Sequence, residues 1–184
     1  MAFGRPKKKP EPLNEAGLYD YAVKALGRQM RSEAELRRLM GGRVEQGAAG
    51  EAVIAAVIAQ LKERHYLDDQ SFAETYARLR QQSEKLGQRR VSQALSQKGV
   101  SSEIVRETVE ARYADTNEEA LAREHLERKR IHKPENPKET ARVMRRLVTA
   151  GFSTGVIYKI LRQWDVPDET LAALDNLDDE THEE

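Results

Sequence analysis

The chain has 184 residues, of which 39% are hydrophobic, 34% are charged and only 5% are aromatic, a balance that suits amphipathic helices better than a thick β-sandwich core. The absence of cysteine excludes disulfides and thiolate zinc sites, and we expect a cytoplasmic protein. The net charge is zero, yet residues 165–184 carry nine acidic groups without Lys or Arg, so residues 1–164 have a net charge of +9. Such a basic body indicates a polyanionic partner, or a protein surface beside one.

The two ends of the chain differ from its middle. Residues 1–14 contain three of the six prolines and a lysine run, which predicts a disordered basic arm. This arm lacks the apolar run of a signal peptide, and no segment approaches membrane-spanning length, so we expect a soluble chain with no membrane contact. Residues 165–184 form an acidic tail, which either improves solubility or competes with a partner for the basic surface.

Between these ends the apolar residues recur at helical spacing, and strand-like alternation is absent. In residues 15–66 the spacing predicts helices around 19–26, 32–40 and 51–64, with a glycine-rich turn over residues 41–50. We expect this segment to be the first of three tandem three-helix units.

Two further units complete the predicted fold. Residues 67–115 form the second unit and residues 116–164 the third, in which Pro134 and Pro137 favour a non-helical break. The predicted fold class is therefore all-α, with three-helix repeats in an elongated, curved arrangement. No heptad seam is present, so we expect a monomer.

An internal repeat supports this division, because residues 91–109 match residues 143–161 at a constant offset of 52. Each copy is predicted to be a helix, a tight turn and a second helix. Gly99 and Gly151 lie where a helix end needs a left-handed residue. The next helix can be capped by Ser101 or Ser102 in the first copy and by Ser153 or Thr154 in the second. The matching apolar pairs are Val91 and Val143, Leu95 and Leu147, Val100 and Phe152, Ile104 and Val156, Val105 and Ile157, and Val109 and Leu161.

Four local strings, at residues 28–36, 65–73, 97–101 and 150–153, resemble those of the RecX family of recombination regulators. Residues 28–36 (Arg-Gln-Met-Arg-Ser-Glu-Ala-Glu-Leu) are similar to its first-unit string, and residues 65–73 (His-Tyr-Leu-Asp-Asp-Gln-Ser-Phe-Ala) are similar to its unit junction. Residues 97–101 (Gln-Lys-Gly-Val-Ser) and 150–153 (Ala-Gly-Phe-Ser) are similar to its later turns. The resemblance covers residues 15–163, and the order and spacing of the four strings make it specific.

The resemblance implies an all-helical, non-enzymatic protein that binds the filament of RecA on DNA. Members of the family modulate, and mainly inhibit, the ATP hydrolysis, strand exchange and co-protease activity of RecA. The family has no catalytic residues to carry over to this chain. The long glycine-rich turn over residues 41–50 and the charged ends depart from the family pattern.

The residues give no independent sign of catalysis, metal binding or a cofactor. The four histidines are dispersed and form no metal-spaced pair. The glycine-rich turn lacks the Gly-Lys-Ser/Thr ending of a phosphate-binding loop. No nucleophile stands beside a base and an orienting group.

Basic residues are therefore the candidates for binding a filament or nucleic acid. At 100° per residue, three arginines of the third unit cluster on an arc beside the apolar stripe of Val143 and Leu147. Basic groups of the second unit and of the linker between 128 and 133 could continue this stripe, and an ordinary solvated helix face is the alternative. The candidates are Arg89, Arg90, Lys98, Arg128, Lys129, Arg130, Lys133, Arg142, Arg145 and Arg146.

A helix-turn-helix transcription regulator is the alternative function, because the spacing of Leu95, Gly99 and Val105 fits the core of that motif. The second helix of each repeat offers few long donors for base edges, which disfavours this alternative. We expect at most a weak, sequence-independent affinity for DNA beneath a dominant protein partner.

Overall fold

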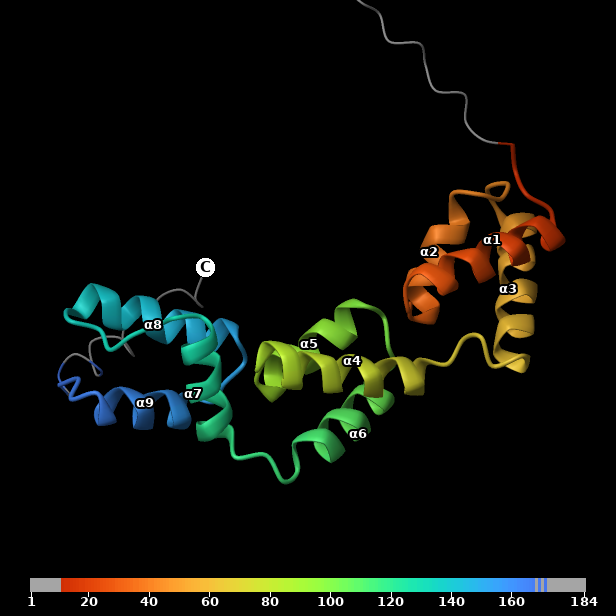
Figure 1. The fold of residues 1–184 in the computed structure, drawn as a ribbon. Helices are drawn as coiled ribbons and strands as arrows, with labels where there is room; N and C mark the ends of the chain where they lie inside the picture. The colour runs from red at the N-terminus through yellow and green to blue at the C-terminus, as the bar shows by residue number, and fades with distance from the viewer. Residues whose placement is uncertain (1–10, 168, 170, 172–184) are drawn as a thin grey trace, which may run out of the picture. The chain divides into compact units, whose positions relative to one another are not determined.

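The computed structural model describes residues 11–167, 169 and 171. Over this part of the chain it contains nine α-helices and no strand (Figure 1), which confirms the all-α prediction. The predicted basic arm lies outside the described residues up to residue 10, and most of the predicted acidic tail lies outside them as well. No helix in the described part is long and apolar enough to span a membrane.

The chain divides into two compact units. Unit 1 is formed by the described residues of Met1–Ala73 and Gln97–Ile104, and unit 2 by those of Glu74–Ser96 and Val105–Glu184. The nine helices follow one another in the predicted order, but the middle set of three contributes residues to both units. The boundaries of three separate repeats stay a prediction.

Unit 1 contains α1 (Glu15–Arg28), α2 (Glu33–Gly41) and α3 (Ala48–Glu63), which pack against one another (Figure 1). The first residues of α4 (Asp69–Glu84) also belong to it. One apolar stripe from each helix is buried, as the helical spacing predicts. The core residues are Leu18, Ala22, Ala25, Leu36, Met40, Ile54, Val57, Ile58, Leu61 and Leu67.

Side-chain caps fix where the first two helices begin. The Asn14 side chain accepts a hydrogen bond from the Gly17 backbone nitrogen at the start of α1. At the start of α2, Ser32 accepts from the Glu35 nitrogen while the Glu35 carboxylate accepts from the Ser32 nitrogen. This reciprocal pair satisfies two of the donors that a helix start leaves open.

The glycine-rich turn is shorter than predicted, because α3 begins at Ala48 and thus includes Gly50. Gly50 is buried, and a side chain there would collide with the carbonyl oxygen of Glu45. The loop before α3 folds back over this glycine, so the residue serves close packing and not turn flexibility.

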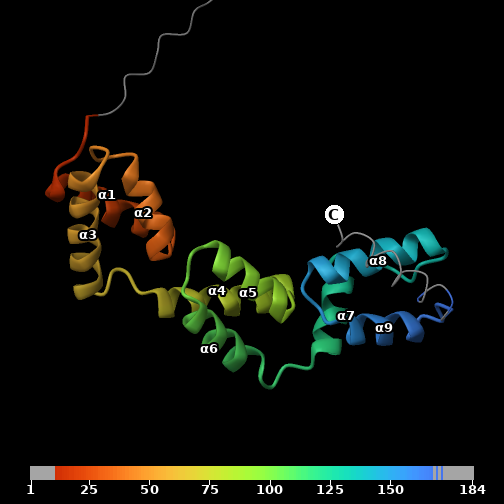
Figure 2. The ribbon, with the colours of Figure 1, turned by 180° about the vertical axis from the view of Figure 1, so that it is seen from behind.

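Unit 2 contains the rest of α4, most of α5 (Gln88–Gln97) and of α6 (Ser102–Tyr113), and α7 (Glu118–Arg128), α8 (Pro137–Thr149) and α9 (Thr154–Gln163). In Figure 2, α7 crosses α8 and α9, which lie side by side. Most residues of the main core of unit 2 come from α7, α8 and α9. The core residues are Leu121, Ala122, Leu126, Val143, Met144, Leu147, Ala150, Phe152, Ile157, Ile160, Leu161, Val166 and Leu171.

The predicted break in the third unit separates α7 from α8. Pro134 lies in this connection, and Pro137 is the first residue of α8, where the missing N–H of proline costs no helical hydrogen bond. The Asn136 side chain accepts from the Glu139 nitrogen at 3.0 Å and caps the helix.

Matching residues of the internal repeat, which are 52 positions apart, are buried alike. Leu95 and Leu147 are both fully buried, and the matching residues of the following helices, Val105 and Ile157, are buried as well. Gly99 and Gly151 have φ angles of 80° and 89°, which confirms the predicted left-handed turns.

The glycine turns have a second role that the sequence did not reveal, because each packs against the start of another helix. In unit 1 the buried Ser32 hydroxyl donates to the Lys98 carbonyl at 2.6 Å, and a methyl group at Gly99 would lie within 3 Å of the Ala34 side chain. We call this contact junction 1.

Junction 2 is the equivalent contact within unit 2. The Gly87 backbone nitrogen donates to the Ala150 carbonyl at 2.8 Å, and a methyl group at Gly151 would lie within 3 Å of the Arg90 backbone nitrogen. The turns are again offset by 52 residues, so the internal repeat encodes a packing contact as well as a helix end.

The predicted serine caps differ in the two copies. Ser101 accepts from the Ile104 nitrogen at 3.4 Å, whereas the Ser153 side chain makes no cap bond to α9. The Ser153 hydroxyl donates instead to the Glu118 carboxylate at 2.7 Å, and its backbone nitrogen donates to the same group at 2.6 Å. Hydrogen bonds to an ionised carboxylate are stronger than those between neutral groups, and this pair joins Ser153 at the start of α9 to α7.

Candidate functional site

The predicted basic residues lie on three elements. The first three lie on α5 or directly after it, the next four at the end of α7 and in the connection that follows, and the last three on α8. In chain order these groups are Arg89, Arg90 and Lys98; Arg128, Lys129, Arg130 and Lys133; and Arg142, Arg145 and Arg146.

Four of these ten residues line one open cavity of about 690 Å³ within unit 2. Arg90 comes from α5, Lys129 from the end of α7, and the other two from α8. Apolar side chains also line the cavity, so a ligand there would meet charge and hydrocarbon together. The cationic members are Arg90, Lys129, Arg145 and Arg146, and the apolar wall is formed by Leu86, Ala94, Ile131 and Ala150. We call this the cationic cavity.

These four cations are not neutralised by the fold. None of them forms an ion pair with a described residue, and Arg90 donates a single hydrogen bond at 3.1 Å to the neutral Gln93 side chain. Arg145, Arg146 and Lys129 are exposed, whereas Arg90 is half-buried. Like charges gathered around one hollow raise the local positive potential and favour an anionic ligand.

The sequence-based search missed three further residues of the cavity, which are Tyr76, Arg80 and Glu84. The Arg80 guanidinium lies over the Tyr76 ring, 4.8 Å from its centroid, and pairs with Glu84 one turn later. Their spacing of four residues on α4 is the signal that could have shown them as one face. Since the Arg80 charge is matched by Glu84, the excess charge of the cavity comes from the other four cations.

His125 also lines the cavity but adds no charge near neutral pH. Burial lowers the pKa of its imidazole, and the positive charge of Lys129 lowers it further. Its Nδ1 lies 3.1 Å from the Glu84 carbonyl oxygen, which can only accept, so Nδ1 carries the proton. The ring packs edge to face on Phe152 with 5.7 Å between the ring centroids, so this part of the cavity wall contacts the core of unit 2.

Two of the remaining predicted cations are held by ion pairs. Lys98 pairs with Glu35 at 2.6 Å in unit 1, where both side chains are mostly covered, and its amine lies 5.8 Å from the Phe72 ring centroid. Lys133 pairs with Asp165 at 2.8 Å on an exposed surface. Lys98 is therefore integrated into junction 1.

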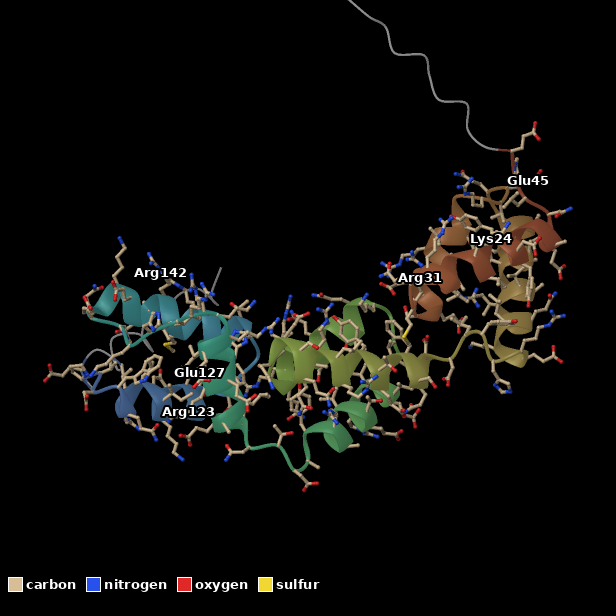
Figure 3. The ribbon with its side chains drawn as sticks, viewed as in Figure 1. Lys24, Arg31, Glu45, Arg123, Glu127 and Arg142 are labelled. Carbon is tan, nitrogen blue, oxygen red and sulfur yellow. The ribbon has the colours of Figure 1, made fainter. Side chains whose placement is uncertain are left out.

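The other four predicted cations are exposed and do not line the cationic cavity. They are Arg89, Arg128, Arg130 and Arg142. Figure 3 shows Arg142 projecting from α8 away from the ribbon. The structure thus separates Arg142 from Arg145 and Arg146, which the helical arc had grouped together.

The charge and the apolar side chains of the cationic cavity are suited to binding an anionic ligand. Nothing among the side chains around the cavity resembles a nucleophile with its base. Throughout the described part of the chain, no group of three metal-ligating side chains is found.

Comparison with known proteins identifies the family of the chain. A family model described as RecX, second three-helix domain, matches residues 68–109. The chain is 36% identical over 157 residues to the regulatory protein RecX of Cronobacter sakazakii, covering 80% of this chain and 92% of that one. It is 28% identical over 155 residues to the regulatory protein RecX of Oceanobacillus iheyensis, of whose length it spans 55%.

Solved structures show the same fold. The crystal structure of RecX from Lactobacillus salivarius superposes with a TM-score of 0.60 at 22% identity, covering 82% of this chain and 96% of that one. A second crystal structure of a regulatory protein RecX gives a TM-score of 0.65 at 21% identity, covering 81% and 71%. Fold alone would not decide the family, but the Cronobacter relative is similar over nearly its whole length. The chain belongs to the RecX family of regulatory proteins.

Proposed function

We propose that the protein is a non-enzymatic, cytoplasmic regulator that binds the RecA–DNA filament and mainly inhibits its ATP hydrolysis, strand exchange and co-protease activity. The observation that carries this proposal is the cationic cavity, where Arg90, Lys129, Arg145 and Arg146 converge without carboxylate partners in the described chain. Membership of the RecX family supports RecA as the partner.

Electrostatics explains why such a cavity suits a filament. A nucleoprotein filament presents many anionic groups in a regular array, and unpaired cations on a small protein speed encounter with such a surface. The cations also release counterions on contact, which makes the affinity depend steeply on salt. Any affinity for free DNA is expected to be weak and independent of sequence.

The test is the ATPase activity of RecA on single-stranded DNA with increasing amounts of the protein. We expect hydrolysis to fall as the protein is added, and the double variant Arg145→Glu with Arg146→Glu to need a higher concentration. The matched control is Lys138→Glu with Arg142→Glu, because both residues are exposed on α8 outside the cavity. An ATPase rate that never responds to the wild-type protein contradicts the proposed function.

A further inference from the structure

We propose that the cationic cavity is a peptide-binding site whose occupant is the acidic segment of the same chain, residues 172–184. This segment lies outside the described residues. Binding of the segment does not depend on the proposed function. Only its consequence, competition with the filament for the same cations, rests on that function.

The chemistry of the segment matches that of the cavity. It contains six carboxylates, no Lys or Arg, and two leucines, Leu174 and Leu177, next to the acidic run. The cavity offers four cations that have no ion-pair partner among the described residues, and its apolar wall includes Leu86 and Ile131. Carboxylates interleaved with leucines can therefore satisfy the charges and cover the apolar wall at once. The six carboxylates belong to Asp175, Asp178, Asp179, Glu180, Glu183 and Glu184.

The segment starts from the unit that holds the cavity. Val166 and Leu171 are 8% and 3% exposed and belong to the core of unit 2, so the chain is anchored there just before residue 172. The 13 residues that follow span up to about 43 Å when extended. The helices of the unit are only about 15–20 Å long at 1.5 Å per residue. Val166 lies beside Pro137 at the start of α8, and Thr149 and Ala150 at the other end of that helix line the cavity. The segment is therefore long enough to run the length of α8 and reach the cavity.

Because the acidic segment belongs to the same chain as the cavity, even a weak interaction between the two is enough to keep the cavity occupied. A ligand joined by a short flexible linker has an effective concentration in the millimolar range. A peptide that binds with a dissociation constant of about 100 µM would then occupy the cavity about nine-tenths of the time. An external anion competing for the same cations would lose about tenfold in affinity.

The aromatic side chains of the cavity favour a peptide over single-stranded nucleic acid. Base stacking needs a free ring face, but Arg80 covers one face of Tyr76. The buried His125 ring packs on Phe152. Nucleic acid in this cavity would therefore rely mainly on its phosphates, and it is the competing occupant that the experiment must detect.

The direct test places a spin label on the segment in the full-length protein. The chain has no cysteine, so Thr181→Cys gives a single labelling site that keeps all six carboxylates. We expect paramagnetic broadening of the backbone amide signals of Ala94, Ile131 and Ala150. The broadening should be lost on adding Arg145→Glu with Arg146→Glu, and should persist with Lys138→Glu and Arg142→Glu. A circular dichroism spectrum that matches the wild type will show that each variant is folded.

A second experiment supplies the segment from outside. In a full-length variant whose six carboxylates are changed to amides, a synthetic peptide of residues 172–184 should shift the same three amide signals. A peptide with Asn and Gln in place of Asp and Glu should not. The amide variant itself should bind RecA–DNA filaments about tenfold more tightly than the wild type.

The outcomes separate this inference from the proposed function. Broadening and peptide shifts at the cavity without any effect on RecA would support the binding site and overturn the proposed function. Absence of both effects would overturn the inference, whatever the protein does to RecA. Shifts caused by a single-stranded oligonucleotide but not by the peptide would also overturn it, in favour of a phosphate-bearing occupant.

Discussion

Junctions 1 and 2 use the same backbone arrangement with opposite electrostatic results. In each, a turn with a left-handed glycine packs on the first residues of a helix. The third residue of that helix is Glu35 in junction 1, and it pairs with Lys98 of the turn. The third residue is Arg90 in junction 2, where the turn offers the uncharged Ala150.

The difference shows how a repeat can divide structural and binding roles between its copies. In junction 1 the charges of Lys98 and Glu35 pair with each other inside unit 1, beside the completely buried Ser32. Junction 2 relies on a backbone hydrogen bond for the same packing, and Arg90, which lines the cavity with Arg145 and Arg146, has no ion-pair partner in the described part of the chain. The geometry needed for the fold is retained while the charge becomes available for a ligand.

The largest expected effect tests whether the two helices that lead into the turns are equivalent. Leu95 and Leu147 are fully buried four residues before Gly99 and Gly151, so replacing either leucine by Ala should cost roughly 2–5 kcal/mol. Chemical denaturation measures the loss. A cost well under 1 kcal/mol at both positions would mean that the repeat register is wrong.

The next effect tests the close packing of the turns themselves. Gly151→Ala should lower the free energy of unfolding by about 2–4 kcal/mol, because a left-handed backbone and a clash with the Arg90 backbone both oppose a side chain. Gly99→Ala should cost less, since its closest neighbour is the Ala34 side chain and not backbone. Gly155→Ala, in α9 with open space around it, serves as the control and should be neutral or stabilising. Equal stability of all three variants would exclude the packing role.

A smaller effect distinguishes the paired cation of junction 1 from the cations of the cavity. Lys98→Met should cost about 1 kcal/mol because it leaves the mostly covered Glu35 without its partner. Lys159→Met is the matched control, since Lys159 pairs with Glu119 from a side chain that is 62% exposed, and it should cost about half as much or less. Neither variant should change filament affinity. A marked loss of affinity with Lys98→Met would place that residue among the binding cations.

The smallest effect concerns pH and the histidine beside junction 2. Folding lowers the pKa of His125 below its value in the unfolded chain. The folded state therefore favours the neutral ring, and its full stability is present at pH values above about 6.5. As the pH falls below that value, the unfolded chain takes up a proton more readily than the folded protein, and stability is lost. The thermal midpoint of the wild type should therefore fall more between pH 7.5 and pH 5 than that of His125→Gln. Parallel curves for the two proteins would show that the imidazole stays unperturbed.

The sequence predicts the helices and the glycine turns because both depend on local spacing. It places Arg142, Arg145 and Arg146 on one arc of a helix, but spacing within a helix does not say which neighbour that arc faces. The cavity takes only the last two, together with Arg90 from another helix. Likewise, Lys98 meets Glu35 across 63 residues of sequence, and no local pattern reveals that pair. Tertiary packing decides which cations remain free.

The central claim is that the four cations of the cationic cavity bind the filament, and the salt dependence of binding to preformed RecA–DNA filaments tests it most directly. We expect wild-type affinity to fall steeply as salt rises. Arg145→Glu with Arg146→Glu should bind about tenfold more weakly at low salt and show a slope smaller by about 2 in a plot of log affinity against log salt. Lys138→Glu with Arg142→Glu should stay much closer to the wild type. Unchanged affinity and an unchanged slope in the cavity variant would contradict the account and return Arg145 and Arg146 to an ordinary solvated helix face.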